Sequence, residues 1–139
     1  MPREIRMEHT EGLGRTAEVW VDGALLTVID GLSTREQRTE PGELENVSFR
    51  YDSDEGVDWN QAVLENPQHR VAIEHVKGAN YTGFGRVEQV MPPIIQFEQL
   101  RLQDPNWTTD EGLVGLYVRV PIDRLTLIQT PKEDWPEGM

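Results

Sequence analysis

The sequence predicts a mostly β protein, either a small antiparallel barrel or a two-sheet sandwich, with one short helix at about residues 58–65. Apolar and polar residues alternate with a period of two along most of the 139-residue chain, which is typical of half-buried strands. Only one segment has helical spacing, and no strand–helix–strand alternation occurs, which argues against a parallel α/β sheet. Paired glycines and proline corners, which let strands bend and close, favour the barrel.

The length predicts one domain, since single domains cluster at roughly 100–150 residues. We expect residues 1–129 to form this domain. Residues 130–139 hold two prolines and several acidic residues without any periodicity, so they predict an acidic, flexible C-terminal tail. The absence of cysteine excludes disulfides, thiolate zinc sites and a cysteine nucleophile.

The first strands are predicted around a hairpin. Residues 17–22 alternate regularly, and Asp22-Gly23 is a strong hairpin signal because glycine accepts a positive φ angle. Residues 24–29 are apolar on both faces apart from Thr27, as expected of a central strand. Residues 3–9 alternate more weakly and predict an edge strand.

The helix is predicted after a long loop and a further strand. Residues 30–43 are polar and contain glycine and proline, which predicts a mobile loop, and alternation resumes over residues 44–51. Asp58 is a helix N-cap, with Gln61 three residues later as the second half of a capping box. Asn66-Pro67 ends the helix, because the residue before proline avoids the α region. The apolar stripe of this helix consists of Trp59, Ala62 and Val63.

The second half of the chain predicts strands only. Within residues 94–102 the apolar positions change phase by one residue, which predicts a β-bulge near Glu98-Gln99. Pro121 is expected at the joint between the last two strands. The predicted strands cover residues 69–76, 81–91, 94–102, 113–120 and 122–128.

The charge balance restricts the class of partner. Twenty-five acidic residues against 13 basic ones give a net charge of −12. Such a surface argues against direct binding to nucleic acid, which requires basic charge, and against an anionic membrane surface. The first residues do not form a signal peptide, and no run approaches the roughly 18 apolar residues of a membrane span. We therefore expect a cytoplasmic protein.

An acidic run provides the first metal candidates. Asp52, Asp54 and Asp58 alternate around a glycine, and such aspartates can surround a Ca²⁺ ion. The run does not fit an EF-hand loop, whose twelfth position would be Val63 instead of glutamate. The alternative is a turn and a helix cap, where carboxylates lie at the positive end of the helix dipole.

The histidines provide the other metal candidate. His69 and His75 are too far apart along one predicted strand to bind the same ion. His75 could combine with Glu88 or His9, but no spacing requires it. We therefore expect neither a metal nor another cofactor.

No catalytic motif is present. None of the three serines lies in a G-x-S-x-G elbow, which favours a non-enzymatic role. Gly78, Gly83 and Gly85 could cradle an anion beside Lys77 and Arg86, but they match no phosphate-binding motif. A hairpin turn and a strand kink also account for them.

Two tryptophans are the partner-binding candidates. Trp107 lies in a polar loop and Trp135 in the acidic tail beside Glu133 and Asp134, outside every predicted strand. Tryptophan is enriched at binding hot spots. The alternative is that each indole folds back to cover a barrel end or an edge strand.

Three functional classes follow. We favour a non-catalytic protein–protein binding or assembly module, whose partner is another protein or a second copy of the chain. The second class is an acidic nucleic-acid mimic that blocks a basic protein, although the acids are spread along the chain. The third is a small enzyme or ligand carrier with a barrel cavity that Tyr81, Arg119 and Arg124 could line.

Overall fold

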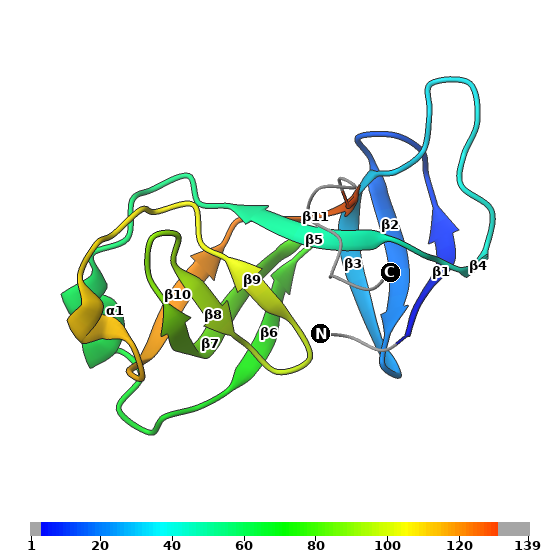
Figure 1. The fold of residues 1–139 in the computed structure, drawn as a ribbon. Coiled ribbons are helices and arrows are strands. Elements are labelled where there is room, and N and C mark those ends of the chain that lie inside the picture. The colour runs from blue at the N-terminus through cyan, green and yellow to red at the C-terminus, as the bar shows by residue number, and fades with distance from the viewer. Residues whose placement is uncertain (1–3, 131–139) are drawn as a thin grey trace, which may run out of the picture. The chain divides into compact units, whose positions relative to one another are not determined.

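The computed structural model describes residues 4–130, which form two compact units (Figure 1). The central unit comprises residues 50–125, and the terminal unit comprises the segments on either side of them. The boundary falls within two strands, β5 (Val47–Asp52) and β11 (Arg124–Gln129). Strands dominate the described residues, which contain one short α-helix, so the predicted mostly β class is confirmed.

The terminal unit contains a six-stranded sheet in the order β4-β1-β2-β3-β11-β5. Ala17, Val19 and Val21 alternate into its core, as the sequence predicts. The predicted hairpin joins β2 to β3, with φ angles of 48° at Asp22 and 87° at Gly23. The strands that belong wholly to this unit are β1 (Ile5–Thr10), β2 (Thr16–Val21), β3 (Ala24–Gly31) and β4 (Gly42–Glu43).

The central position of β3 is confirmed, but its second neighbour is not antiparallel. β3 pairs antiparallel with β2 on one side and parallel with β11 on the other. Gly31 permits this approach, because a Cβ at that position would lie 2.6 Å from the Leu127 carbonyl oxygen. The β3–β11 pair is therefore a parallel exception to the expected antiparallel arrangement, between strands about a hundred residues apart in the sequence.

The central unit contains a five-stranded, curled sheet that forms a half-barrel (Figure 1). β10, β7, β8 and β9 follow one another, and β6 also pairs with β7. Its core includes Phe97, Ile95, Val118 and Ile122, all fully buried. The strands are β6 (Ala72–Lys77), β7 (Asn80–Gln89), β8 (Ile94–Gln96), β9 (Arg101–Gln103) and β10 (Tyr117–Ile122).

The glycines of β7 have a packing role that the sequence did not indicate. β7 runs without interruption through Gly83 and Gly85. A methyl group at Gly83 would overlap the Phe97 ring, and one at Gly85 would lie 2.6 Å from the carbonyl oxygen of Gln96. Both glycines therefore allow neighbouring core groups to approach the backbone of β7.

The predicted β-bulge near Glu98-Gln99 is also wrong. Residues 94–102 form two strands, β8 and β9, that pair with each other across a tight turn. The backbone N–H of Phe97 donates to the carbonyl oxygen of Leu100 at 2.8 Å and closes this turn. The apolar residues move from odd to even positions because the chain turns back on itself between the two strands. In the sequence pattern, such a turn looks the same as one inserted residue in a single strand.

The remaining strand boundaries differ in smaller ways. The strand predicted at residue 69 begins at Ala72, and the one predicted at residue 113 begins at Tyr117, because Glu111–Leu113 form a 3₁₀-helix. Pro121 lies within β10 and not at its end. Because β10 is the edge strand of its sheet, the missing N–H of proline is tolerated there.

The helix prediction is confirmed as α1 (Trp59–Leu64). The Asp58 carboxylate accepts hydrogen bonds from the backbone N–H groups of Asn60 and Gln61, at 3.1 and 3.3 Å. The capping box is incomplete, because the Gln61 side-chain oxygen does not accept a hydrogen bond from the backbone N–H of Asp58, and the Gln61 amide donates to Glu65 at 3.1 Å. Within the described residues, no helix is long and apolar enough to cross a membrane.

Candidate binding sites: an exposed tryptophan loop and an arginine-lined cleft

The Trp107 side chain is exposed on a loop of the central unit. Its fractional exposure is 63%, so most of the surface of this residue faces solvent. The loop runs from Asp104 to Asp110, between β9 and the 3₁₀-helix. We call residues 104–110 the tryptophan loop. An exposed indole is a large apolar group left in water, which is a feature of recognition sites.

A buried carboxylate fixes the base of the tryptophan loop. Asp104 accepts a hydrogen bond from the Tyr51 hydroxyl at 2.5 Å through one oxygen. Its other oxygen accepts from the backbone N–H and the side-chain amide of Asn106, at 2.7 and 2.9 Å. The backbone N–H of Asp104 donates to the Pro93 carbonyl oxygen at 2.9 Å. The residue directly before Trp107 is thus attached to the core.

Burial controls the ionisation of this pair. It raises the pKa of Asp104 above its ordinary value, and the hydrogen bonds from Tyr51 and Asn106 offset only part of that effect. Burial and the charge of Asp104 raise the pKa of Tyr51 well above its ordinary value, so the hydroxyl keeps its proton. Tyr51 therefore acts as a hydrogen-bond donor to the base of the tryptophan loop.

An acidic segment borders the tryptophan loop. The side-chain oxygen of Asn106 accepts a hydrogen bond from the backbone N–H of Val57 at 3.2 Å, which ties the loop to the segment before α1. That segment carries Asp54 and Glu55, both exposed. Exposed acidic side chains therefore lie in the segment that is hydrogen-bonded to the tryptophan loop.

The predicted metal candidates occupy separate structural roles. Asp52 forms an ion pair with Arg124 at 3.2 Å, and Asp58 caps α1. The backbone N–H of Asp54 donates to the Asp123 carboxylate. His75 donates to the carbonyl oxygen of Gly78 in the turn after β6. Among residues 4–130, no group of three or more such side chains is placed to hold a metal ion.

The other sequence-predicted side chains are not brought together. Trp135, Glu133 and Asp134 lie outside the described residues. Arg119 lines two small clefts of about 240 and 230 Å³ beside its ion pair with Glu65, and neither Tyr81 nor Arg124 contributes to them.

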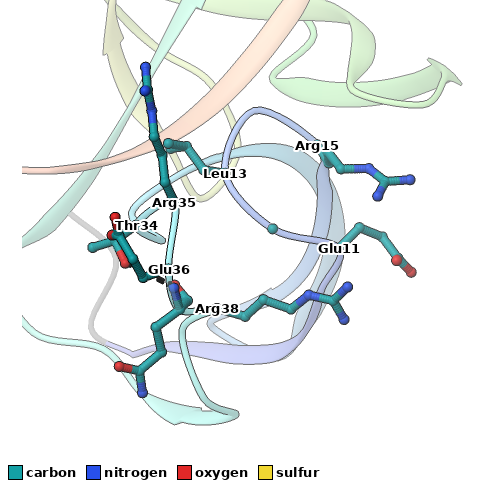
Figure 2. A pocket seen from close by; sticks show the side chains of 9 residues that line it. Glu11, Leu13, Arg15, Thr34, Arg35, Glu36 and Arg38 are labelled. Carbon is teal, nitrogen blue, oxygen red and sulfur yellow. Dashed lines mark hydrogen bonds between the residues drawn. The ribbon is translucent and has the colours of Figure 1, made fainter.

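A cleft of about 500 Å³ in the terminal unit was not foreseen from the sequence (Figure 2). Two loops form it, residues 11–15 between β1 and β2 and residues 34–38 after β3. We call it the arginine cleft. Leu13 is its one apolar side chain of any size, and the other side chains that line it are those of Glu11, Arg15, Thr34, Arg35, Glu36, Gln37 and Arg38.

Asp30 holds both loops of the arginine cleft. This fully buried carboxylate, at the end of β3, accepts hydrogen bonds from the hydroxyls of Thr10 and Ser33. It also accepts from the backbone N–H groups of Leu32 and Ser33, at 2.7 and 2.9 Å. Thr10 in turn accepts from the backbone N–H of Gly12 at 3.0 Å. One carboxylate therefore connects the start of each loop.

Hydrogen bonding keeps Asp30 ionised despite its burial. Burial by itself raises the pKa of Asp30, but the hydroxyl donors of Ser33 and Thr10 and the backbone donors outweigh it, so the pKa lies below its ordinary value. A sequence signal for this residue existed. Leu26 and Val28 point inward from β3, and Asp30 continues their alternation, so a polar residue occupies a core position.

The arginines of the cleft keep their charge available. None of Arg15, Arg35 and Arg38 forms an ion pair with another described residue. Glu11 is hydrogen-bonded to His9 at 2.8 Å. That bond and the charge of His9, with a smaller effect of Arg38 and Arg15, hold the pKa of Glu11 below its ordinary value.

No family model, no curated protein and no solved structure matches this chain.

Proposed function

We propose that the protein is a non-catalytic protein-binding module that docks through Trp107. The observation that carries the proposal is an indole with 63% exposure on a loop whose base is buried and hydrogen-bonded. An exposed indole buries little apolar surface in the isolated chain, so it contributes little to folding by burial. Tryptophan is among the residues that most often dominate the energy of a protein interface.

The fixed base of the tryptophan loop supports this role. Ordering a loop on binding lowers the affinity, because conformational freedom is lost. Asp104 and Asn106 already hold the residues before Trp107, through hydrogen bonds of 2.5–2.9 Å. When the indole enters a partner's pocket, the main conformational freedom that is lost is therefore that of the Trp107 side chain.

The charges near the loop define the partner. Asp54 and Glu55 precede α1, and Asp110 and Glu111 follow the tryptophan loop, all four exposed. A complementary surface offers an apolar pocket for the indole with lysine and arginine side chains at its rim. The partner is thus a protein with a basic, pocketed surface.

The alternatives lack a corresponding observation. A nucleic-acid mimic needs carboxylates in one continuous stripe, whereas the exposed acids here are spread along the whole sequence. For an enzyme, we expect shifted pKa values in a cleft. Here, Asp104 and Tyr51 have raised pKa values and are buried in a hydrogen-bonded network that holds a loop. The carboxylates with shifted pKa values that line clefts, Glu11 and Glu65, owe their lowered pKa values chiefly to hydrogen bonds with neighbouring side chains.

The proposal is tested by placing a photo-crosslinking amino acid at position 107 and, as a control, at Val76. Val76 has the same exposed fraction, 63%, and also belongs to the central unit. In cells of the native source, we expect position 107 to crosslink to one defined protein and position 76 not to do so. Equal crosslinking to a broad set of proteins from both positions would exclude Trp107 as a specific anchor.

A further inference from the structure

The arginine cleft concentrates positive charge in an acidic chain. The described part of the terminal unit contains four arginines, and three of them line this cleft. The chain has a net charge of −12, so carboxylates are abundant, yet none of the three guanidinium groups is paired with one among residues 4–130. Unpaired guanidinium groups on neighbouring loops are available to an external anion.

Two of these groups lie on the same side of the cleft. Figure 2 shows Arg15 and Arg38 extending toward the side where Glu11 lies, whereas Arg35 extends the other way, beside Leu13. Arg15 belongs to the first loop and Arg38 to the second. A ligand between them would therefore be held from both walls.

The walls are positioned before any ligand binds. Asp30 connects the two loops through Thr10 and Ser33, and the Ser33 hydroxyl accepts a hydrogen bond from the backbone N–H of Thr39 at 2.8 Å. The Arg38 side chain crosses Gly12, since a Cβ there would lie 3.9 Å from Cγ and Nε of Arg38. The Arg38 side chain is therefore within contact distance of the first loop at position 12.

We propose that the arginine cleft binds a small phosphate-bearing anion between Arg15 and Arg38. A phosphate group is tetrahedral and carries up to two charges, so guanidinium groups from two walls can each donate to different oxygens. A single carboxylate is planar and is satisfied by one arginine. The lining offers no aromatic side chain for a base to stack on, so the cleft selects the anionic group and not a nucleobase.

Glu11 limits the affinity of this site. Its carboxylate is hydrogen-bonded to His9, and this bond lowers its pKa most. The positive charges of Arg38 and Arg15 lower the pKa further, so the carboxylate interacts electrostatically with both arginines. It therefore repels any anion that enters between the two arginines. Replacing it with glutamine removes this repulsion and keeps a similar shape.

The test is calorimetric titration of the full chain with inorganic phosphate and with pyrophosphate at constant ionic strength. The double variant R15Q/R38Q is expected to bind at least about tenfold more weakly than wild type, because two charged hydrogen-bond donors are lost. The matched control is R6Q, since Arg6 is exposed and unpaired in the same unit but does not line the cleft. It should change the affinity less than about twofold, while E11Q should increase it about threefold or more.

Three results would overturn the proposal: no saturable binding of either phosphate species, an equal loss of affinity in R6Q and R15Q/R38Q, or saturable binding of citrate without binding of phosphate or pyrophosphate. Circular dichroism of each variant establishes that it is folded. Because the cleft and the tryptophan loop belong to different units, the outcome is independent of the proposed docking through Trp107.

Discussion

Single buried carboxylates organise both candidate sites. Asp30 in the terminal unit accepts hydrogen bonds from two hydroxyls and two backbone N–H groups, and Asp104 in the central unit accepts from Tyr51 and Asn106. The sequence predicts the Asp58 cap because its partners are two and three residues away. It does not predict the contact of Asp30 with Thr10 or that of Asp104 with Tyr51, because these partners are 20 and 53 residues distant.

Replacing Asp30 should destabilise the protein and loosen the arginine cleft. We expect D30N to lower the free energy of unfolding by about 2–3 kcal/mol, because an amide cannot accept from all four donors. Chemical denaturation measures this loss, and hydrogen exchange should quicken in residues 11–15 and 34–38. A change below about 0.5 kcal/mol would show that Asp30 does not hold the loops.

Asp30 also makes stability depend on acidity. Its pKa is lower in the folded chain than in the unfolded one, so its contribution is present above the ordinary pKa of about 4. That contribution is lost as the pH falls through the lowered folded pKa. We therefore expect the stability difference between wild type and D30N to shrink on acidification below about pH 4. A difference that grows in this range would contradict the assignment.

Asp104 should have the opposite pH dependence. Its pKa is raised in the folded chain, so its favourable contribution is present below the ordinary value and is lost as the pH rises through the folded pKa. Between about pH 4 and 7, the stability of D104N relative to wild type should therefore shift in favour of the variant. Denaturation curves over this range test it, with D54N as the exposed control. A shift in favour of wild type would mean that the pKa of Asp104 is lowered instead.

At the level of elements, alternation identified the strands but not all their partners. The β2–β3 hairpin was predictable because Asp22-Gly23 lies between its strands. The β8–β9 hairpin was mistaken for one bulged strand, because a tight turn and a bulge both shift the apolar phase. The parallel β3–β11 pair joins distant segments, and no local pattern encodes it.

The packing on β7 gives a prediction at this scale. Gly83→Ala should lower the free energy of unfolding by about 2–3 kcal/mol, because a methyl group would displace the buried ring of Phe97. The control is Gly56→Ala, where the nearest atom to an added Cβ is 3.9 Å away, and its effect should stay below about 0.5 kcal/mol. Equal stability of both variants in thermal denaturation would refute the packing role of Gly83.

For the whole molecule, the expectation of one domain over residues 1–129 stays a prediction with a direct test. Because β5 and β11 contribute residues to both compact units, we expect the units to unfold together. Two variants, one retaining only Trp20 and the other only Trp59, report on the terminal and central units. Their urea denaturation midpoints should coincide. Separate midpoints would show two independent domains.

The net charge of −12 describes the whole surface and does not reveal either candidate site. The tryptophan loop could be predicted because an indole in a polar loop is conspicuous in the sequence. The arginine cleft could not, since its two loops are brought together by a buried carboxylate at the end of β3. Composition describes the acidic surface as a whole, and folding creates a local concentration of arginine side chains that composition does not reveal.

The central claim, docking through Trp107, is tested most directly by the affinity for the protein crosslinked at position 107. We predict that W107A weakens this affinity by at least about 30-fold, as for a hot-spot residue worth roughly 2 kcal/mol or more. V76A, altered at an equally exposed apolar position, should bind as wild type does. Affinities of W107A and wild type that agree within about twofold would contradict the account.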